Sequence, residues 1–367
     1  MTLFVLALAI IIAIQFFYVV IVFGRLAFFK KISSSGTESN EPISLIICCK
    51  NELENLQNHL SLFLGQDYPK FEVVVINDCS TDGTKEFLEE QSMLYKHLKT
   101  VNVEPNETFW SNKKYALTLG IKATKHDHLV FTDADCKPVS NQWLKHMSKF
   151  DFEKQIILGY SPYEQKAGFL NLLIRFETVF TAIQYLSWAI FSKPYMGVGR
   201  NLAYKKSLFF EKNGFVNHIK IRSGDDDLFI NETAKKSNTQ IQIHPESFVF
   251  SIPKMTWAEW IYQKRRHITT STYYKWTDKI KLSLFYFSQI AFFVLMILNL
   301  IYLNPFEIIL GLIGFRYLFV LIIFGMTSNK LKDAKLTWFY ILLEPLLILL
   351  QFYIFAKNKI SKPLHWK

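Results

Sequence analysis

Residues 43–64 of this 367-residue chain read ISLIICCKNELENLQNHLSLFL. The apolar run from Ile43 to Cys48 is followed by the polar triplet Lys50-Asn51-Glu52. Apolar residues then recur at helical spacing, at Leu53, Leu56, Leu60, Phe63 and Leu64. This succession predicts a strand, a turn and an amphipathic helix, which is the opening unit of an α/β domain.

The same alternation continues over the next 70 residues. Further strands are predicted at Glu72 to Asn77, Thr100 to Val103 and His128 to Thr132, and helices at Thr84 to about Tyr95 and at Lys113 to Ala123. Strands and helices that alternate at these lengths predict a mostly parallel sheet. Such sheets bind ligands at the carboxyl ends of their strands, so the residues that follow each strand are the candidates for a site.

The composition indicates that part of the chain lies in an apolar environment and not in water. Half of the residues are hydrophobic and the formal net charge is +11, which excludes a disordered chain and a small disulfide scaffold. The apolar run from Thr2 to Phe23 is long enough to cross a bilayer, and Arg25, Lys30 and Lys31 follow it. We therefore predict a transmembrane anchor at residues 1–30, with the domain that follows it in the cytosol.

A second apolar block occupies residues 281–356. It divides into Ser283 to Leu303, Phe306 to Met326 and Leu336 to Phe355, and we predict two or three spans. Glu344-Pro345 lies inside the last segment, where a charge is costly, so this segment is expected to be re-entrant or interfacial. Counting four spans would place the basic tail at residues 357–367 outside, whereas its lysines favour the cytosol.

The four cysteines, Cys48, Cys49, Cys79 and Cys136, form no CxxC pair and show no ligand spacing with histidine. They are expected to be free thiols of a reduced compartment. Neither a zinc site nor a structural disulfide is predicted from them.

Carboxylates follow two of the predicted strands. Asp78 comes directly after one strand, in a turn that also contains Asp82; the alternative interpretation is that this turn only caps the next helix. Asp133 and Asp135 follow the later strand. Residues i and i+2 of an extended strand end point the same way, so these two carboxylates can converge on one hard cation.

Two further clusters lie downstream. Gly224 precedes Asp225, Asp226 and Asp227, and three adjacent carboxylates, if partly buried, raise the pKa of at least one to a value that suits proton abstraction. The alternative is a solvated acidic loop. The segment Gln263 to His267 is basic and is either functional or a juxtamembrane patch for anionic headgroups.

Residues 167–191 are apolar but contain Arg175, Glu177 and Gln184. We predict an amphipathic segment that packs on the globular domain or lies on the bilayer surface. The globular part carries no basic stripe with interleaved aromatic residues, so the net charge favours a membrane and not a nucleic acid as partner.

Taken in order, these motifs resemble the family 2 glycosyltransferases, which are inverting enzymes with the GT-A nucleotide-diphospho-sugar-binding fold. The resemblance runs from Ile43 to Tyr274, within a cytosolic domain predicted at residues 41–280. The matching pieces are Ile47 to Glu52, Asp78-x-Ser-x-Asp82-Gly, Lys113 before Ala116-Leu117, Asp133-Ala-Asp135, Asn201 with Ala203, Gly224-Asp-Asp226 and Gln263-x-x-Arg266.

The resemblance implies a role for each matched position. It implies that the donor is a nucleotide-diphosphate sugar, with a preference for UDP. It implies that the donor is bound by Asp78, Asp82, Lys113, Asp133, Asn201, Gln263 and Arg266. It implies Mg²⁺ or Mn²⁺ on Asp135 and Asp133, which would neutralise charge on the departing diphosphate. It implies that Asp226 is the base that takes the acceptor proton, with Asp225 as the alternative, because the register of Gly-Asp-Asp-Asp against the family's Gly-Glu-Asp leaves both open.

The sequence departs from the processive members of the family at His267, where they carry a Trp. We therefore expect transfer of one or a few sugars to a lipid-linked or membrane-dissolved acceptor, by a multi-pass protein of the cytoplasmic membrane and cell envelope. A processive polysaccharide synthase is the alternative within the enzyme class. A transport or export component with a regulatory nucleotide-sugar domain is the alternative outside it. The oligomeric state is left open.

Overall fold

Every residue of strand β1 (Ile43–Cys49) is buried in the computed structural model, because parallel neighbours flank it on both sides. These neighbours are β2 (Phe71–Asp78) and β4 (His128–Asp133). A strand covered on both edges and both faces is expected to be apolar throughout, which is how the first stretch of the sequence reads.

The main sheet has seven strands in the order β3-β2-β1-β4-β7-β6-β8. The remaining strands are β3 (Leu98–Val103), β6 (Ile156–Leu158), β7 (Leu202–Lys205) and β8 (Thr239–Ile241). β7 runs antiparallel to β4 and to β6, whereas all other pairings are parallel. The predicted mostly parallel sheet is thus confirmed. A small second sheet pairs β5 (Cys136–Pro138) with β9 (Val249–Ser251).

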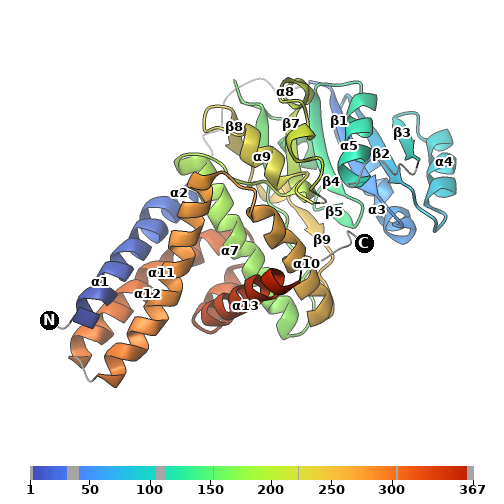
Figure 1. Ribbon diagram of the computed structural model, residues 1–367. Coiled ribbons are helices and arrows are strands. Elements are labelled where there is room, and N and C mark those ends of the chain that lie inside the picture. The colour runs from blue at the N-terminus through green and yellow to red at the C-terminus, as the bar shows by residue number, and fades with distance from the viewer. Residues whose placement is uncertain are drawn as a thin grey trace. The chain divides into compact units, whose positions relative to one another are not determined.

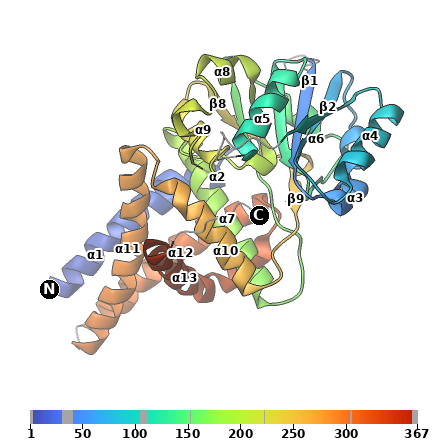
Figure 2. The ribbon, with the colours of Figure 1, turned by 45° about the vertical axis from the view of Figure 1, so that its right-hand side comes forward.

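Helices cover both faces of the sheet (Figures 1 and 2). On one face, α3 (Leu53–Leu64) and α6 (Trp143–Met147) share a core with β1 and β2. On the other face lies α5 (Asn112–Ala123), where a Cβ on Gly120 would come within 2.1 Å of the Ile76 side chain. A glycine is therefore required for this close approach. Along β3 lies α4 (Thr84–Leu94).

The structure describes residues 3–30, 41–104, 112–151, 153–221, 223–302 and 305–361. They divide into two compact units. The sheet unit takes its described residues from Ile32–Lys166 and Ser192–Lys254. The helical unit takes its described residues from Met1–Lys31, Ala167–Phe191 and Met255–Pro363.

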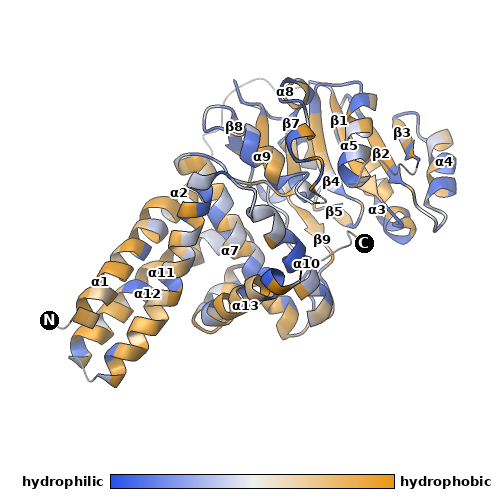
Figure 3. Cartoon of the chain, in the orientation of Figure 1, coloured by the Kyte–Doolittle hydropathy of each residue, from blue (hydrophilic) through white to orange (hydrophobic). Residues whose placement is uncertain are grey.

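The helical unit contains four helices that are long and apolar enough to span a membrane, at Leu3–Ala27, Trp276–Ile301, Phe306–Lys330 and Ala334–Ile360. The first of them consists of α1 (Leu3–Phe16), a π-helical stretch (Phe17–Phe23) and α2 (Gly24–Ala27). The second and third are α11 (Trp276–Ile301) and α12 (Phe306–Lys330), and the fourth joins a 3₁₀ turn (Ala334–Phe339) to α13 (Tyr340–Ile360). Figure 3 shows apolar residues along the length of α1, α11 and α12.

Two more helices belong to this unit. They are α7 (Phe169–Phe191), which occupies the segment predicted to be amphipathic at residues 167–191, and α10 (Trp257–Ser271). The packing of that segment on the globular domain or on the bilayer surface stays a prediction. Arg175 of α7 donates from Nε to Asp333 Oδ2 at 2.8 Å, and α7 also contacts α2 and α13. The charge on Arg175 is thus paired inside the unit. The polar break predicted after Met326 is shorter than expected, because α12 continues to Lys330.

Glu344 has a buried partner in this unit. Arg316 of α12 donates from Nη1 to Glu344 Oε2 of α13 at 2.8 Å and from Nε to Gln15 Oε1 of α1 at 2.7 Å. The Tyr340 hydroxyl donates to Glu344 Oε1 at 3.2 Å. Each charge is therefore compensated, and this pairing joins α1, α12 and α13. Lys362 and Lys367 of the predicted basic tail lie outside the described residues.

Candidate active site

The Lys113 ammonium joins two of the predicted acidic motifs. Its Nζ lies 3.3 Å from Asp133 Oδ1, at the end of β4, and 3.1 Å from Asp225 Oδ2, just before α9 (Asp227–Thr233). Burial opposes the charge on Lys113, but Asp133 and Asp225 outweigh it and hold the pKa of the ammonium well above its usual value. A cation thus fixes these two carboxylates next to each other, although they are 92 positions apart (225 − 133).

Asp226 is held by two backbone donors. Gly199, the first residue of a 3₁₀ turn (Gly199–Asn201), donates from its N–H to Asp226 Oδ2 at 2.6 Å, and the Asp227 N–H donates to Oδ1 at 2.7 Å. Burial first, and then the neighbouring Asp225 and Asp227, raise the pKa of Asp226 to about 7. Asp225 has the opposite shift: burial raises its pKa, but Lys113 and local hydrogen bonds lower it below the usual value. The two neighbours therefore differ in protonation state near neutral pH.

These groups line one pocket at the carboxyl edge of the sheet. Its polar lining consists of Cys48, Lys113, Thr132, Asp133, Gly199, Tyr204, Asp225 and Asp226. Ile46, Leu117, Phe131 and Leu202 complete the wall. The structure thus brings the predicted Asp133, Lys113, Asp225 and Asp226 together.

Asp135 lies beside this group, two residues beyond Asp133. Burial and the charge of Asp133 raise the pKa of Asp135, which means that the two carboxylates repel each other. A divalent cation would relieve this repulsion, and carboxylate oxygens are ligands that Mg²⁺ and Mn²⁺ accept. The residues present therefore fit the predicted metal.

Asp78, the last residue of β2, is a buried acceptor. It is fully buried, and no N–H or O–H group of the described residues donates to either of its carboxylate oxygens. Burial raises the pKa of Asp78, while Lys50 acts to lower it. A buried carboxylate in this state is costly unless a ligand donates to it, and the N–H groups of a nucleobase are donors of this kind.

Asp82 acts as a cap in this structure. Its Oδ1 accepts from the Thr84 N–H at 3.1 Å and from the Thr84 hydroxyl at 2.6 Å, and its Oδ2 accepts from the Leu53 N–H at 3.1 Å. Burial acts to raise the pKa of Asp82, but these hydrogen bonds lower it overall. The alternative stated for this turn, a helix cap, therefore describes the contacts that Asp82 makes. Its contact with a donor stays a prediction.

Asn201 hydrogen-bonds three segments next to the pocket. Its amide nitrogen donates to the carbonyls of Tyr160 and Ser247, both at 2.8 Å, and its Oδ1 accepts from Trp143 Nε1 at 3.0 Å. A Cβ on Gly159 would lie 2.5 Å from the Asn201 side chain. These contacts give Asn201 a positioning role next to Gly199, and direct binding of the donor stays a prediction.

Gln263 and Arg266 both lie on α10, in the helical unit. The helix begins with a capping box, in which Thr256 and Glu259 satisfy each other's backbone N–H groups. The Lys264 ammonium between them pairs with Glu177 of α7, and Arg265 Nε donates to Asn358 Oδ1 of α13 at 2.9 Å. Part of the basic segment thus binds other helices of its own unit, and closure of Gln263 and Arg266 over a donor stays a prediction.

Sequence reasoning missed three residues of the site. Gly199 is the backbone donor to Asp226, and Arg200 lies with its guanidinium carbon 4.4 Å from the centre of the Tyr163 ring. Lys114 is fully buried and donates from Nζ to the carbonyls of His218 and Ile221, at 2.8 and 3.0 Å. A signal for Gly199 was present, because a glycine pair ahead of an acidic motif indicates a close approach of the backbone. The buried bonds of Lys114 have no such signature.

The sequence model described as "Glycosyl transferase family 2" matches residues 44–210. A poly-beta-1,6-N-acetyl-D-glucosamine synthase of Staphylococcus epidermidis is 35% identical over 113 residues, which are 31% of this chain and 25% of the relative. A 4,4'-diaponeurosporenoate glycosyltransferase of Staphylococcus haemolyticus is 28% identical over 201 residues, 52% of this chain and 49% of the relative. The alignments thus span a quarter to a half of the length of these curated relatives.

Among solved structures, a mannosyltransferase from Pyrobaculum calidifontis in complex with GDP-Man and Mn2+ superposes with a TM-score of 0.56. It is 15% identical, and the superposition covers 92% of this chain and 98% of that chain. This likeness shows a shared fold. With the match of residues 44–210 and the acidic pocket at the edge of the sheet, it follows that the chain contains a family 2 glycosyltransferase domain with the GT-A fold.

Proposed function

We propose that the chain is an inverting glycosyltransferase that moves a sugar from a nucleotide-diphosphate sugar to a lipid-linked or membrane-dissolved acceptor. The observation that carries the proposal is the meeting of Asp133, Lys113, Asp225 and Asp226 in one pocket of a family 2 domain. One pocket thus offers a cation, carboxylates for a metal and a carboxylate of raised pKa. Each of these three kinds of group assists glycosyl transfer from a diphosphate.

The donor would occupy the carboxyl edge of the sheet. The buried carboxylate of Asp78 would accept hydrogen bonds from the base, as the resemblance also implies for a UDP-sugar. A divalent ion held by Asp135 and Asp133 would neutralise charge on the departing diphosphate. Arg200 has a buried Nη1 without an acceptor among the described residues, and it lies near enough to Asp135 to lower the pKa of that carboxyl. We infer that this N–H group donates to a diphosphate oxygen.

The acceptor hydroxyl would approach Asp226. Its pKa of about 7 places it where a carboxylate is both deprotonated and basic enough to accept a proton in the transition state. The hydroxyl oxygen then attacks the anomeric carbon as the bond to the diphosphate breaks, which inverts the configuration. Asp225 is the alternative base, but its ion pair with Lys113 favours a role in holding that cation.

The four apolar helices support an acceptor that reaches the enzyme from a bilayer. We propose a multi-pass protein of the cytoplasmic membrane with its sheet unit in the cytosol, where nucleotide sugars are made. Arg25 lies in the last turn of the first apolar helix and supports this orientation by the positive-inside rule.

The test is turnover by membranes that contain the full chain. Labelled UDP- and GDP-sugars are supplied with Mn²⁺ and a lipid extract, and release of nucleoside diphosphate is followed together with the label in the lipid phase. We expect release that Asp226→Asn abolishes. Labelled lipid of low mass supports a single transfer, and a ladder of long products would instead establish a processive synthase.

A matched control separates binding from turnover. Asp226→Asn should still bind the donor, because the groups proposed to bind it do not include Asp226. Donor binding without release in the wild-type chain, with every donor and acceptor extract, would contradict the enzyme and favour a regulatory nucleotide-sugar domain of a transport or export component.

A further inference from the structure

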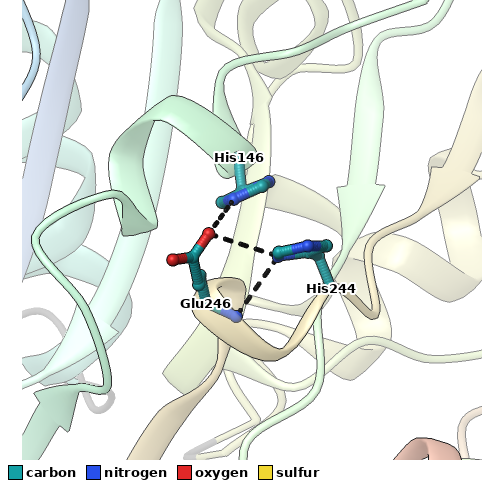
Figure 4. A group of neighbouring side chains, drawn as sticks. All are labelled: His146, His244 and Glu246. Carbon is teal, nitrogen blue, oxygen red and sulfur yellow. Dashed lines mark hydrogen bonds and ion pairs between the residues drawn. The ribbon is translucent and has the colours of Figure 1, made fainter. Parts of the chain in front are cut away.

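A second group of potential metal ligands lies in the sheet unit, apart from the pocket lining. His146 of α6, His244 and Glu246 of the 3₁₀ turn Pro245–Ser247 offer three ligand atoms within 4.8 Å of one another. Figure 4 shows a carboxylate oxygen of Glu246 that faces both imidazole rings. It lies 3.1 Å from His146 Nε2 and 3.6 Å from His244 Nδ1.

These separations match the edges of a tetrahedral metal site. Zinc binds histidine nitrogen and carboxylate oxygen at about 2.0–2.1 Å, so adjacent ligands of a tetrahedron lie about 3.3 Å apart. The two distances from the Glu246 oxygen bracket this value. The His244 Nδ1 atom also accepts from the Glu246 N–H at 3.3 Å, and a metal would take that lone pair in its place.

The backbone that carries the ligands is fixed by buried side chains. The fully buried Gln242 donates from Nε2 to the His146 carbonyl at 3.0 Å, and its Oε1 accepts from the His244 N–H at 3.1 Å. The Ser247 hydroxyl donates to the His244 carbonyl at 2.6 Å. One buried amide thus joins the two segments that present the histidines, which is the kind of preorganisation that a metal site requires.

The two histidine rings lie against each other. They stack with centroids 4.2 Å apart and planes 17° from parallel, and two imidazolium ions at this distance would repel each other. Burial lowers the pKa of His146 and His244 acts in the same direction, although Glu246 opposes them. Metals bind the neutral imidazole, which is the form that burial favours at His146.

We propose that His146, His244 and Glu246 bind a zinc-class transition-metal ion, with solvent in the fourth position. Two imidazoles and one carboxylate favour Zn²⁺ or Co²⁺ over Mg²⁺, which prefers oxygen ligands alone. The ion would tie α6 to the Pro245–Ser247 turn. Trp143 of α6 and Ser247 both hydrogen-bond Asn201, so the bound ion would also restrict the motion of Asn201, which adjoins the pocket residue Gly199.

The test uses the full-length chain in detergent with saturating Mg²⁺, which occupies any site made of oxygen ligands. Co²⁺ is then titrated and its visible d–d absorption recorded, because tetrahedral Co²⁺ absorbs far more strongly than octahedral Co²⁺. We expect one equivalent of the intense band, and a rise in the unfolding temperature when Zn²⁺ replaces Co²⁺. The band should persist in Asp135→Ala.

Variants of the ligands decide the assignment. His146→Ala and Glu246→Gln should each weaken Zn²⁺ binding by roughly a hundredfold or more, because even loss of an outer-shell partner costs 10–100-fold. His126→Ala, a histidine of the same unit outside the group, should bind as the wild type does. A wild-type chain without the intense band, or ligand variants that bind Co²⁺ and Zn²⁺ as the wild type does, would overturn the proposal.

Discussion

The Gly199 backbone N–H donates to Asp226 Oδ2 at 2.6 Å, and this contact joins the turn before β7 to the start of α9. The Asp227 N–H holds the other oxygen at 2.7 Å. Two fixed donors leave the carboxylate one orientation, with a lone pair free on each oxygen. A base held this way needs little rearrangement before it accepts a proton.

The first prediction concerns pH. A base must be ionised, and because the pKa of Asp226 is raised to about 7, its neutral form prevails below that value. We therefore expect kcat/KM to be constant above pH 7 and to fall about tenfold per pH unit below it. Asp226→Asn should lower kcat/KM by about 10²–10⁴ above pH 7, and this difference from the wild type should narrow as the pH falls below 7. Initial rates of nucleoside diphosphate release between pH 5 and 9 provide the measurement.

Asp225→Asn tests whether Asp225 or Asp226 is the base. Removing a negative charge beside Asp226 should lower the pKa of that carboxyl and move the acid limb of the profile to lower pH, while turnover persists. If Asp225→Asn instead abolishes turnover and Asp226→Asn retains it, the roles of the two carboxylates are reversed.

The second prediction concerns the backbone donor. A Cβ on Gly199 would lie 3.2 Å from Asp226 Oδ2 and 3.3 Å from its Cβ, so Gly199→Ala should displace the base by a few tenths of an ångström. A misplacement of 1 Å can cost about a hundredfold, so we expect kcat to fall roughly tenfold while donor KM changes little. Gly314→Ala, where a Cβ has no neighbour within 4 Å, is the matched control. Equal kcat in Gly199→Ala and wild type would exclude this positioning role.

The third prediction concerns the metal. Chelation with EDTA should abolish turnover, and Mn²⁺ or Mg²⁺ should restore it. Asp135→Ala should reproduce the loss without unfolding the sheet unit, because Asp135 lies in the turn between β4 and β5 and outside the main hydrophobic core. Turnover in EDTA and donor binding by calorimetry provide the measurements, with circular dichroism as the check on folding. Full activity in chelator would remove the metal from the mechanism.

The fourth prediction concerns the charge pair of the helical unit. The Arg316 and Glu344 side chains are 3% and 1% exposed, so removing one leaves the other buried without its partner. Glu344→Leu and Arg316→Met should each destabilise the protein by about 3–5 kcal/mol, whereas the double substitution should recover most of this loss. Thermal unfolding in detergent gives the double-mutant cycle. Additive losses would show that the two residues do not act as a pair.

Local sequence patterns were sufficient for most of the α/β half of the fold. The strands at Ile43, Glu72 and His128 and the helix at Leu53 were predicted within one or two residues, because apolar periodicity reports burial directly. The short strands β6, β7 and β8 were not predicted. They have three or four residues each, too few to show a period, and their pairing depends on partners far along the chain.

Some residues of the candidate site could likewise be predicted from the sequence, and others could not. Asp133 and Asp135 could be found because they follow a recognisable strand, and a sheet collects strand ends at one edge. The Gly224 motif could be found because three carboxylates are adjacent in it. The capping contacts of Asp82 and the interior contacts of Asn201 could not be inferred, because a residue's type does not say whether its polar atoms are already occupied. Arg200 lies outside the matched motifs.

The sequence by itself determined the fold class, the apolar helices and the acidic motifs, since these depend on the order and spacing of residue types along one segment. Tertiary structure decided which carboxylate is ion-paired and which has a raised pKa. It also decided that Arg316 faces Glu344 and that His146 stacks on His244. The physical reason is that burial and charge pairing depend on distance in space, and partners such as Lys113 and Asp225 are 112 positions apart in the sequence (225 − 113).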